Sequence, residues 1–332
     1  MTISSKSTRR QWLAASVGTV AAAAVPAAFA QQRKYPQQPV KFIVPFAAAG
    51  AIDNITRAIA QGMTKELGQS VVVENRAGAA GNIGAASVAR ATADGYTLLV
   101  GTSATHGANP SLFSKPGYDA QKDFEPIALW GLVPNVLVVN AQKGPRTLQE
   151  LMAAAKASPG KLTYASAGTG TSLHLSGAMF EHLANVDLTH VPYKGGGPAS
   201  VDLMGGVVDM MFDTVAVSLP LIQGGKTRPL AIASAERHFA LPDVPTFAEL
   251  GYKDMVFGTW AGLFAPKGTP ADVLAELRRA SDAAMNDASV KATLRTIGVQ
   301  TIPRTGEAFR QFVQQEISRS AQIVKAAGIT AE

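Results

Sequence analysis

The sequence predicts an α/β protein with two domains, each a mostly parallel sheet flanked by helices. Short apolar runs rich in β-branched residues alternate with helical patterns, which is the order expected of parallel sheets covered on both faces. A length of 332 residues exceeds that of one typical domain. Two long apolar stretches interrupted by glycine or proline, 126–139 and 257–266, indicate strands that pass to a second domain and back.

Residues 1–30 have the features of an export signal. Lys6, Arg9 and Arg10 form a positive start, a short apolar segment follows, and 28–30 has the small-x-small form of a cleavage site. We therefore expect the mature chain to begin at Gln31, after Ala30. The arginine pair also fits the twin-arginine export route. No later stretch approaches the about twenty apolar residues of a membrane span, so we expect an exported, water-soluble product.

The composition excludes several classes of function. The chain has 30 Lys and Arg against 24 Asp and Glu, and without the three basic residues of the leader the charge falls from +6 to +3. No basic cluster is interleaved with aromatic residues, so nucleic acid is not an expected partner. The absence of cysteine excludes cysteine nucleophiles, thiolate zinc sites and iron–sulfur clusters. The 47% hydrophobic content can supply a core without disulfides.

The first domain is expected to open with a strand, a turn of small residues and a helix. Pro45 closes the strand at 40–44, because proline cannot donate to an interior ladder. Ile55, Ile59 and Met63 follow at helical spacing. This stretch alone also fits any βα unit of a parallel sheet. The further elements expected here are strands at 70–74 and 96–100, a helix at 83–91, and an irregular segment at 110–124.

The second domain is expected to repeat the strand–helix unit. Thr147 and Glu150 form a capping box that opens a helix. The other expected elements are strands at 162–166, 188–191, 207–212 and 228–234, a helix at 173–183, and after the return three helices starting at 269, 288 and 306. The predicted boundaries place residues 31–132 and 259–332 in lobe I and residues 133–258 in lobe II.

The familiar catalytic motifs are missing from the sequence. It has no phosphate loop, no complete dinucleotide fingerprint and no Gly-x-Ser-x-Gly elbow. Its five histidines, at 106, 174, 182, 190 and 238, do not stand at metal-ligand spacings. We therefore expect no enzyme, no metal and no cofactor. The alternative is an exported serine hydrolase that uses Ser103 or Ser166 with a histidine.

Four turns rich in small and hydroxyl residues each follow a predicted strand, at 46–53, 102–106, 166–172 and 193–197. In open α/β sheets, ligands bind at the carboxyl ends of the strands. Main-chain N–H groups, hydroxyls and helix starts can hold a carboxylate there by several hydrogen bonds of about 0.5–1.5 kcal/mol each. The pattern predicts capture and release of an anion rather than its chemical conversion.

Each of these features also has a purely structural interpretation. The turn at 166–172 could serve only as a helix cap, and 194–197 as a flexible hairpin with a solvated lysine. Asp213 could cap a helix, and Asp53 could complement a helix dipole. His174 is expected to be a packed residue of the first helical turn rather than a catalyst.

The chain resembles the substrate-binding proteins of tripartite tricarboxylate transporters, also called Bug-type solute receptors, over nearly the whole mature length. The resemblance is carried, in order, by Tyr35-Pro36, Pro39-Val40, Ile43-Val44-Pro45-Phe46, Val72-Val73-Glu74-Asn75-Arg76, Gly78, Gly81, Asp94-Gly95-Tyr96-Thr97-Leu98-Leu99, His106, Asn109-Pro110, Ser166-Ala167-Gly168, Gly170, Ser172, His174, Val191-Pro192-Tyr193-Lys194-Gly195, Asp202-Leu203, Gly205-Gly206, Val208-Asp209, Phe212-Asp213, Pro242, Val244-Pro245-Thr246, Ala265-Pro266 and Gly268-Thr269-Pro270.

The resemblance implies a two-lobed, periplasmic-binding-protein-like (type II) α/β fold that closes on a small organic acid. The ligand carboxylate would be held by the turn after the first strand and by the Ser-x-Gly-x-Gly-type turn of lobe II, often through water, while Asp213 and the Tyr193 region face the variable end. The candidate ligand-binding residues are Phe46, Ala48, Ala49, Gly50, Asp53, Ser103, His106, Ser166, Ala167, Gly168, Thr169, Gly170, Thr171, Ser172, Tyr193, Lys194, Gly195 and Asp213.

The implied protein is a periplasmic monomer that delivers its ligand to a tripartite tricarboxylate-type membrane permease. The alternative is a receptor that delivers its ligand to a membrane sensor kinase. One departure from the family pattern concerns the first turn, where Ala49-Gly50 and Ile52-Asp53 replace the usual Gly-Gly and Thr-Asp. We expect Ala49 to limit positive φ and close backbone approach. Ile52 removes a hydroxyl, so we expect a shifted carboxylate contact and a ligand less polar than a dicarboxylate.

Overall fold

The computed structural model describes residue 2, residues 35–326 and residues 328–329. Apart from Thr2, the export signal predicted at 1–30 lies outside these residues. Within the described part, no helix combines the length and the apolar character that crossing a membrane requires.

The first half of the sheet is built on β1 (Val40–Val44), which pairs in parallel with β2 (Val71–Asn75) and with β3 (Thr97–Thr102). The helix α1 (Ala51–Leu67) follows β1 and buries one apolar face that includes Ile55, Ile59 and Met63, as predicted. It ends at Gly68, which takes the left-handed conformation with φ 63°. Because parallel strands end at one edge of a sheet, the turns after β1 and β3 share that edge.

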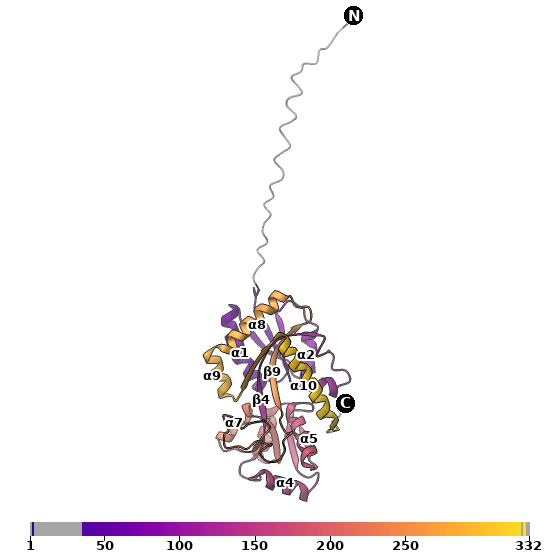
Figure 1. Ribbon diagram of the computed structural model, residues 1–332, viewed down its shortest axis with the longest axis vertical. Helices are drawn as coiled ribbons and strands as arrows, with labels where there is room; N and C mark the ends of the chain where they lie inside the picture. The colour runs from indigo at the N-terminus through magenta and orange to yellow at the C-terminus, as the bar shows by residue number, and fades with distance from the viewer. Residues whose placement is uncertain (1, 3–34, 327, 330–332) are drawn as a thin grey trace. The chain divides into compact units, whose positions relative to one another are not determined.

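One 17-residue strand, β4 (Phe124–Asn140), links the two halves of the sheet, which confirms the predicted crossing strand (Figure 1). Its first part pairs with β9 (Gly258–Pro266) and β10 (Gln300–Thr305), and its last part pairs with β7 (Met210–Thr214) and β8 (Thr227–Ile232). The partners change between Pro134 and Asn135. Register shifts within the β4–β9 ladder mark bulges, which bend a long strand.

The second half of the sheet centres on β5 (Thr163–Ser166), which pairs in parallel with β6 (Thr189–Pro192) and β7. Four helices accompany these strands: α4 (Leu148–Ala157), α5 (Ser172–Ala184), α6 (Gly196–Gly205) and α7 (Val215–Gln223). Half of the predicted capping box is present: Thr147 Oγ1 accepts a hydrogen bond from the Glu150 N–H at 3.1 Å, whereas the Glu150 carboxylate accepts the N–H of Arg146 at 2.6 Å instead of that of Thr147. The strand order is β2-β1-β3-β9-β4-β7-β5-β6.

The C-terminal helices return to the first half of the sheet, as the sequence predicted. They are α8 (Ala271–Asn286), α9 (Ala288–Thr296) and α10 (Gly306–Ala326). Gly62 lets α1 and α8 approach closely, since a Cβ there would lie only 2.8 Å from that of Ala284. Phe309 of α10 packs against Trp260 of β9 with ring centroids 6.0 Å apart. Four short elements complete the described chain: η1 (Ala79–Gly81), α2 (Asn82–Ala89), η2 (Ala104–Ala108) and α3 (Asn109–Leu112).

The sheet is mixed, and its directions follow from the two crossings. The parallel pairs lie within each half, whereas each antiparallel strand pair described involves β4 or β9. This is a two-lobed α/β architecture of the type II binding-protein kind. The exact lobe boundaries at 132/133 and 258/259 stay a prediction, next to the place where β4 changes partners and β9 begins.

Candidate functional site

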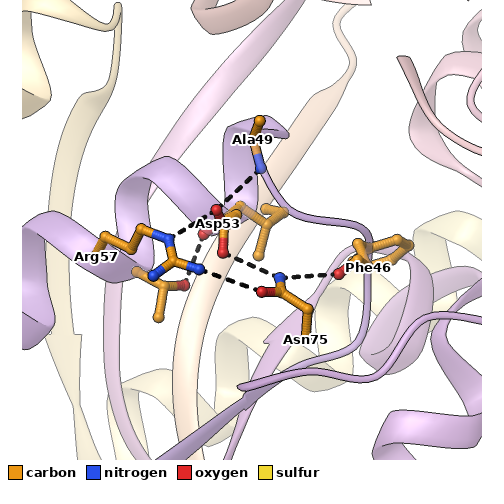
Figure 2. A network of polar contacts seen from close by, with 7 residues as sticks. Phe46, Ala49, Asp53, Arg57 and Asn75 are labelled. Carbon is orange, nitrogen blue, oxygen red and sulfur yellow. Dashed lines mark hydrogen bonds and ion pairs between the residues drawn. The ribbon is translucent and has the colours of Figure 1, made fainter. Parts of the chain in front are cut away.

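The turn after β1 is held by a network of polar side chains around Asp53 (Figure 2). Asp53 Oδ2 accepts hydrogen bonds from the N–H of Ala49 at 3.0 Å and from Nε of Arg57 at 2.9 Å. Its other oxygen accepts a bond from Nδ2 of Asn75 at 3.0 Å, and the same Nδ2 donates to the carbonyl oxygen of Phe46 at 3.0 Å. Both ends of the turn are therefore tied to Asp53 and to the end of β2.

The Asp53 carboxylate is buried and remains charged. Its side chain is 2% exposed. Burial is the largest influence and raises its pKa, but the hydrogen bonds from Arg57, Ala49 and Asn75 together lower the pKa below its usual value. Its oxygens already bind protein donors, so these contacts favour a role in holding the turn over direct contact with an anion.

Ala49 takes the left-handed conformation, with φ 65°. The prediction that alanine would limit positive φ here was therefore wrong. This conformation costs a non-glycine residue about 1–2 kcal/mol, and the bond from Ala49 to Asp53 offsets it. Ala48 and Ala49 are exposed, and Phe46 and Gly50 are half-buried. Gly50 caps α1 without a side-chain bond, so the first N–H groups of this helix have no capping partner.

Ser103 and His106 follow β3 but differ in their surroundings. Ser103 donates a hydrogen bond from Oγ to Oγ1 of Thr259 on β9 at 3.1 Å. His106 is fully buried, and its ring stacks on Phe264 with centroids 4.0 Å apart. Burial lowers its pKa to about 3. The structure therefore places His106 in the core.

The turn at the start of α5 is organised by its own hydroxyl groups. Thr171 donates from Oγ1 to the carbonyl oxygen of Gly168 at 2.7 Å and caps the N–H of His174 at 3.4 Å. The N–H of Gly170 donates to Nδ1 of His174 at 3.1 Å. His174 is thus a packed first-turn residue. Thr169 is exposed at the tip, and Ala167 is half-buried.

Ser166 lies beside a histidine, which bears on the hydrolase alternative. Its Oγ accepts the N–H of Gly168 at 3.1 Å and lies 2.7 Å from Nε2 of His190. Ser166 is 0% exposed, and burial, followed by the neighbouring His174, lowers the pKa of His190 to about 4. In residues 35–326, no carboxylate contacts His190. A buried hydroxyl beside a weak base without an orienting acid is a structural contact rather than an activated nucleophile.

The remaining candidates gather beside this turn because β5, β6 and β7 end at one edge. The Tyr193 N–H donates to the carbonyl oxygen of Ser166 at 3.0 Å, and its hydroxyl donates to Asp202 at 2.6 Å. Lys194 is exposed and Gly195 is half-buried. Asp213 is buried at the end of β7, and burial raises its pKa to about 7. Its carboxylate accepts bonds from the Thr214 N–H and from Ser218 Oγ, both at 2.8 Å.

The turn before α5 contacts elements that surround the first half of the sheet. A Cβ built on Gly170 would lie 3.0 Å from Cδ1 of Leu112 and 3.7 Å from Cβ of Ala80, so this turn touches α3 and η1. At β4, Nδ2 of Asn135 donates to the carbonyl oxygen of Ser172 at 3.0 Å. Two residues earlier, Val133 pairs with Thr259, the partner of Ser103.

Three asparagines that we did not predict as site residues organise these turns. Asn75 holds the first turn, Asn135 holds the start of α5, and Asn109 donates to the carbonyl oxygen of Ala80 at 3.0 Å. Asn135 carried a readable signal, because it is a polar residue inside the apolar stretch 126–139. Asn75 and Asn109 lie at element ends, where asparagine is common and carries little information by itself.

Comparisons with known proteins agree with this geometry. The sequence model of the protein family described as the tripartite tricarboxylate transporter family receptor matches residues 55–329 of this chain. The solved structure of the periplasmic binding protein BugD is 38% identical in sequence; the match covers 90% of this chain and 100% of BugD, with a TM-score of 0.85. The structure of R. palustris Rpa4515 with adipate is 35% identical in sequence. The match covers 90% of this chain and 99% of Rpa4515, with a TM-score of 0.86. The structure of MatC (Rpa3494) from Rhodopseudomonas palustris with bound malate is 38% identical in sequence. The match covers 87% of this chain and 100% of MatC, with a TM-score of 0.82.

The match by the family model covers well over half of the chain, and the three structures match along almost their whole length. The fold, the gathered turns and these matches therefore lead to one identification: the chain belongs to the tripartite tricarboxylate transporter receptor family, whose members are periplasmic solute-binding proteins.

Proposed function

We propose that this protein binds one small organic carboxylate between its lobes and releases it unaltered. The supporting observation is that the turn before α5 reaches η1, which itself lies against the turn after β1. A Cβ on Gly170 would lie 3.7 Å from Cβ of Ala80, and a Cβ on Gly81 would lie 3.2 Å from Cζ of Phe46. Ser172 is tied to Asn135 where β4 changes partners. A ligand at this junction would receive donors from both lobes.

The donors at this junction suit a carboxylate. The N–H groups at the starts of α1 and α5 lack intrahelical acceptors, and the helix dipole favours an anion there. The relatives named above bind adipate and malate, both of which are dicarboxylates. Ala48 and Ala49 give the first turn an exposed apolar surface, which supports a ligand with an apolar chain, so adipate is the better starting probe.

We further propose export to the periplasm and delivery of the ligand to a tripartite tricarboxylate-type permease. The family description names that transporter, which favours a permease over a sensor kinase as the partner. Uptake of the bound acid into vesicles that contain the permease, dependent on added receptor, would support this role. Uptake that is unchanged by the receptor would leave the kinase as the better partner.

A thermal-shift screen tests the binding function. The protein lacking residues 1–30 would first be unfolded and refolded to remove any co-purified ligand. It would then be screened against mono-, di- and tricarboxylates and aromatic acids, with the matching amides as uncharged controls. We expect at least one acid to raise Tm by several degrees, because a ligand that binds only the native state stabilises it. No stabilisation by any acid would refute the proposal.

The hydrolase alternative makes a separate prediction. If Ser166 were a nucleophile activated by His190, a serine-directed fluorophosphonate would label the protein, and Ser166→Ala would abolish the labelling. We expect no labelling of Ser166, because its hydroxyl is buried and its histidine is a weak base. Ser103 is likewise expected to stay unlabelled, since it bonds to Thr259.

A further inference from the structure

We propose that Asp53 and Asn75 are positioning residues, which hold Ala49 in its left-handed conformation and so set the first turn for a carboxylate. This inference rests on the proposed function. It assigns these two residues no contact with the ligand. Figure 2 shows their arrangement, with Asp53 between Ala49, Arg57 and Asn75.

The first step concerns Ala49, which cannot be expected to keep its backbone conformation unaided. Its φ of 65° lies in the region that disfavours a Cβ. The residue is exposed, so packing does not hold it there. The bond that its N–H donates to Asp53 at 3.0 Å does hold it, and this bond joins the turn to the first turn of α1.

The second step concerns Asn75, which fixes the other end of the turn. Its Nδ2 donates both to the Phe46 carbonyl oxygen and to Asp53 Oδ1, each at 3.0 Å. Its own Oδ1 accepts from Nη2 of Arg57 at 3.3 Å. One amide thereby joins the start of the turn, the carboxylate that holds its end, and the last residue of β2.

The third step is the consequence for binding. Without the network, Ala49 would relax to negative φ, and the N–H groups that follow it would turn away from their present directions. A carboxylate would then bind only after the turn is reordered, so its apparent affinity would fall with the fraction of molecules in the competent conformation. Glycine at position 49 would remove the need for the network, because glycine takes positive φ without strain.

A double-mutant cycle between Asp53→Ala and Ala49→Gly tests the proposal. Calorimetric titration with adipate or malate, whichever the wild type binds, gives the affinity at each corner. We expect Asp53→Ala to weaken binding about tenfold in the wild-type background, since lost hydrogen bonds to charged groups have effects of this order. In the Ala49→Gly background we expect the loss to fall below about threefold. Equal losses in both backgrounds would overturn the proposal.

A matched control separates positioning from plain stability. Asp287 is the N-cap of α9 and accepts bonds from the N–H groups of Ser289 and Val290, so it is a hydrogen-bonded carboxylate at the start of a different helix. Asp287→Ala should lower the urea midpoint and leave the affinity unchanged. Asn75→Ala should repeat the background dependence of Asp53→Ala. An affinity loss from Asp287→Ala as large as that from Asp53→Ala would overturn the specific role.

The cycle stays informative if the wild type binds no carboxylate, an outcome that would refute the proposed function alone. The urea midpoints of the four corners then report whether the network holds Ala49. We expect Asp53→Ala to lower the midpoint less in the Ala49→Gly background than in the wild type. Equal shifts in the two backgrounds would overturn the positioning role without reference to any ligand.

Discussion

The imidazole rings of His174 and His190 stack with their centroids 4.0 Å apart, and both rings bind the turn before α5. The Gly170 N–H donates to Nδ1 of His174, and Ser166 Oγ lies 2.7 Å from Nε2 of His190. A ring nitrogen accepts an N–H only when it is unprotonated, so the bond from Gly170 requires a neutral His174. Two stacked imidazolium ions would also repel each other. The turn is therefore sensitive to protonation.

The first prediction is a loss of stability in mild acid that depends on this pair. Burial lowers the pKa of each histidine to about 4, and His174 contributes at His190. Since the unfolded pKa is about 6.5, the unfolded state binds more protons between these values, and stability falls as the pH drops from about 6.5 to 4. His190→Gln should flatten this dependence by roughly 1 kcal/mol. Urea unfolding at several pH values measures it.

The exposed His182 on the same helix supplies the control. His182→Gln should leave the pH dependence of the unfolding free energy unchanged. A profile for His190→Gln that is superimposable on the wild-type profile would contradict the assignment.

The second prediction concerns Asp213 and has the opposite sign. Burial raises its pKa to about 7, above the unfolded value of about 3.9, so the native state binds more protons between these values. Its contribution is therefore present at low pH and is lost as the pH rises through 7. Asp213→Asn keeps a neutral group with similar hydrogen bonds. It should equal the wild type near pH 3, become more stable than the wild type as the pH rises from about 4 to 7, and exceed it by a few kcal/mol at pH 8.

Asp209 precedes the same strand but is exposed, so it provides the comparison. Asp209→Asn should show no gain in unfolding free energy at pH 8, because its exposed carboxylate accepts hydrogen bonds from the N–H and Oγ1 of Thr163. If Asp213→Asn were less stable than the wild type at both pH values, burial would not be the dominant influence on this carboxyl group.

The third prediction tests the contact of the α5 turn with the first half. Gly170 has φ 80°, and a Cβ there would lie 3.0 Å from Leu112. Gly170→Ala should therefore strain the turn, hold the halves apart and weaken carboxylate binding by about tenfold or more. Gly68 has φ 63° with open space around its Cβ position, so Gly68→Ala carries the backbone cost alone. Calorimetry should find its affinity equal to that of the wild type.

The fourth prediction is closure of the lobes about β4 and β9. These strands carry the chain between the proposed lobes, and β4 changes partners between Pro134 and Asn135. Binding between lobes should therefore reduce the radius of gyration in small-angle X-ray scattering. The comparison needs a ligand already shown to bind by calorimetry. Identical scattering with and without that ligand would show that the lobes do not move.

Much of the fold was predictable from the sequence because its signals are local. The long crossing strand β4 and the return strand β9 followed from apolar stretches whose interior glycines and prolines did not end them. The helices α6 and α7 were not predicted, because glycine and proline in their sequences indicated turns although the helices continue through them. Gly196, Gly197 and Pro198 indicate a turn, yet Pro198 is tolerated because it lies in the first turn of α6, where no N–H needs a partner. Pro220 lies in the interior of α7, where proline removes a helical hydrogen bond, so the sequence indicated a break there.

The position of the turns at the strand ends was predictable from the sequence, whereas the contacts of the individual side chains were not. Sequence periodicity places the turns after β1 and β5 at strand ends, where ligands bind. It does not reveal that Asp53 binds Ala49, or that His106 stacks on Phe264, because these contacts depend on packing between distant segments. The edge strand β10 was missed because Pro303 interrupts its pattern, and its ladder with β4 has a register shift there.

The most direct measurement is a crystal structure of the protein with the acid that gives the largest thermal shift. We predict that one carboxylate group lies within hydrogen-bond distance, directly or through a water molecule, of both the turn at 46–52 and the turn at 166–172. A ligand bound to one lobe alone, or at a surface away from both turns, would contradict the account.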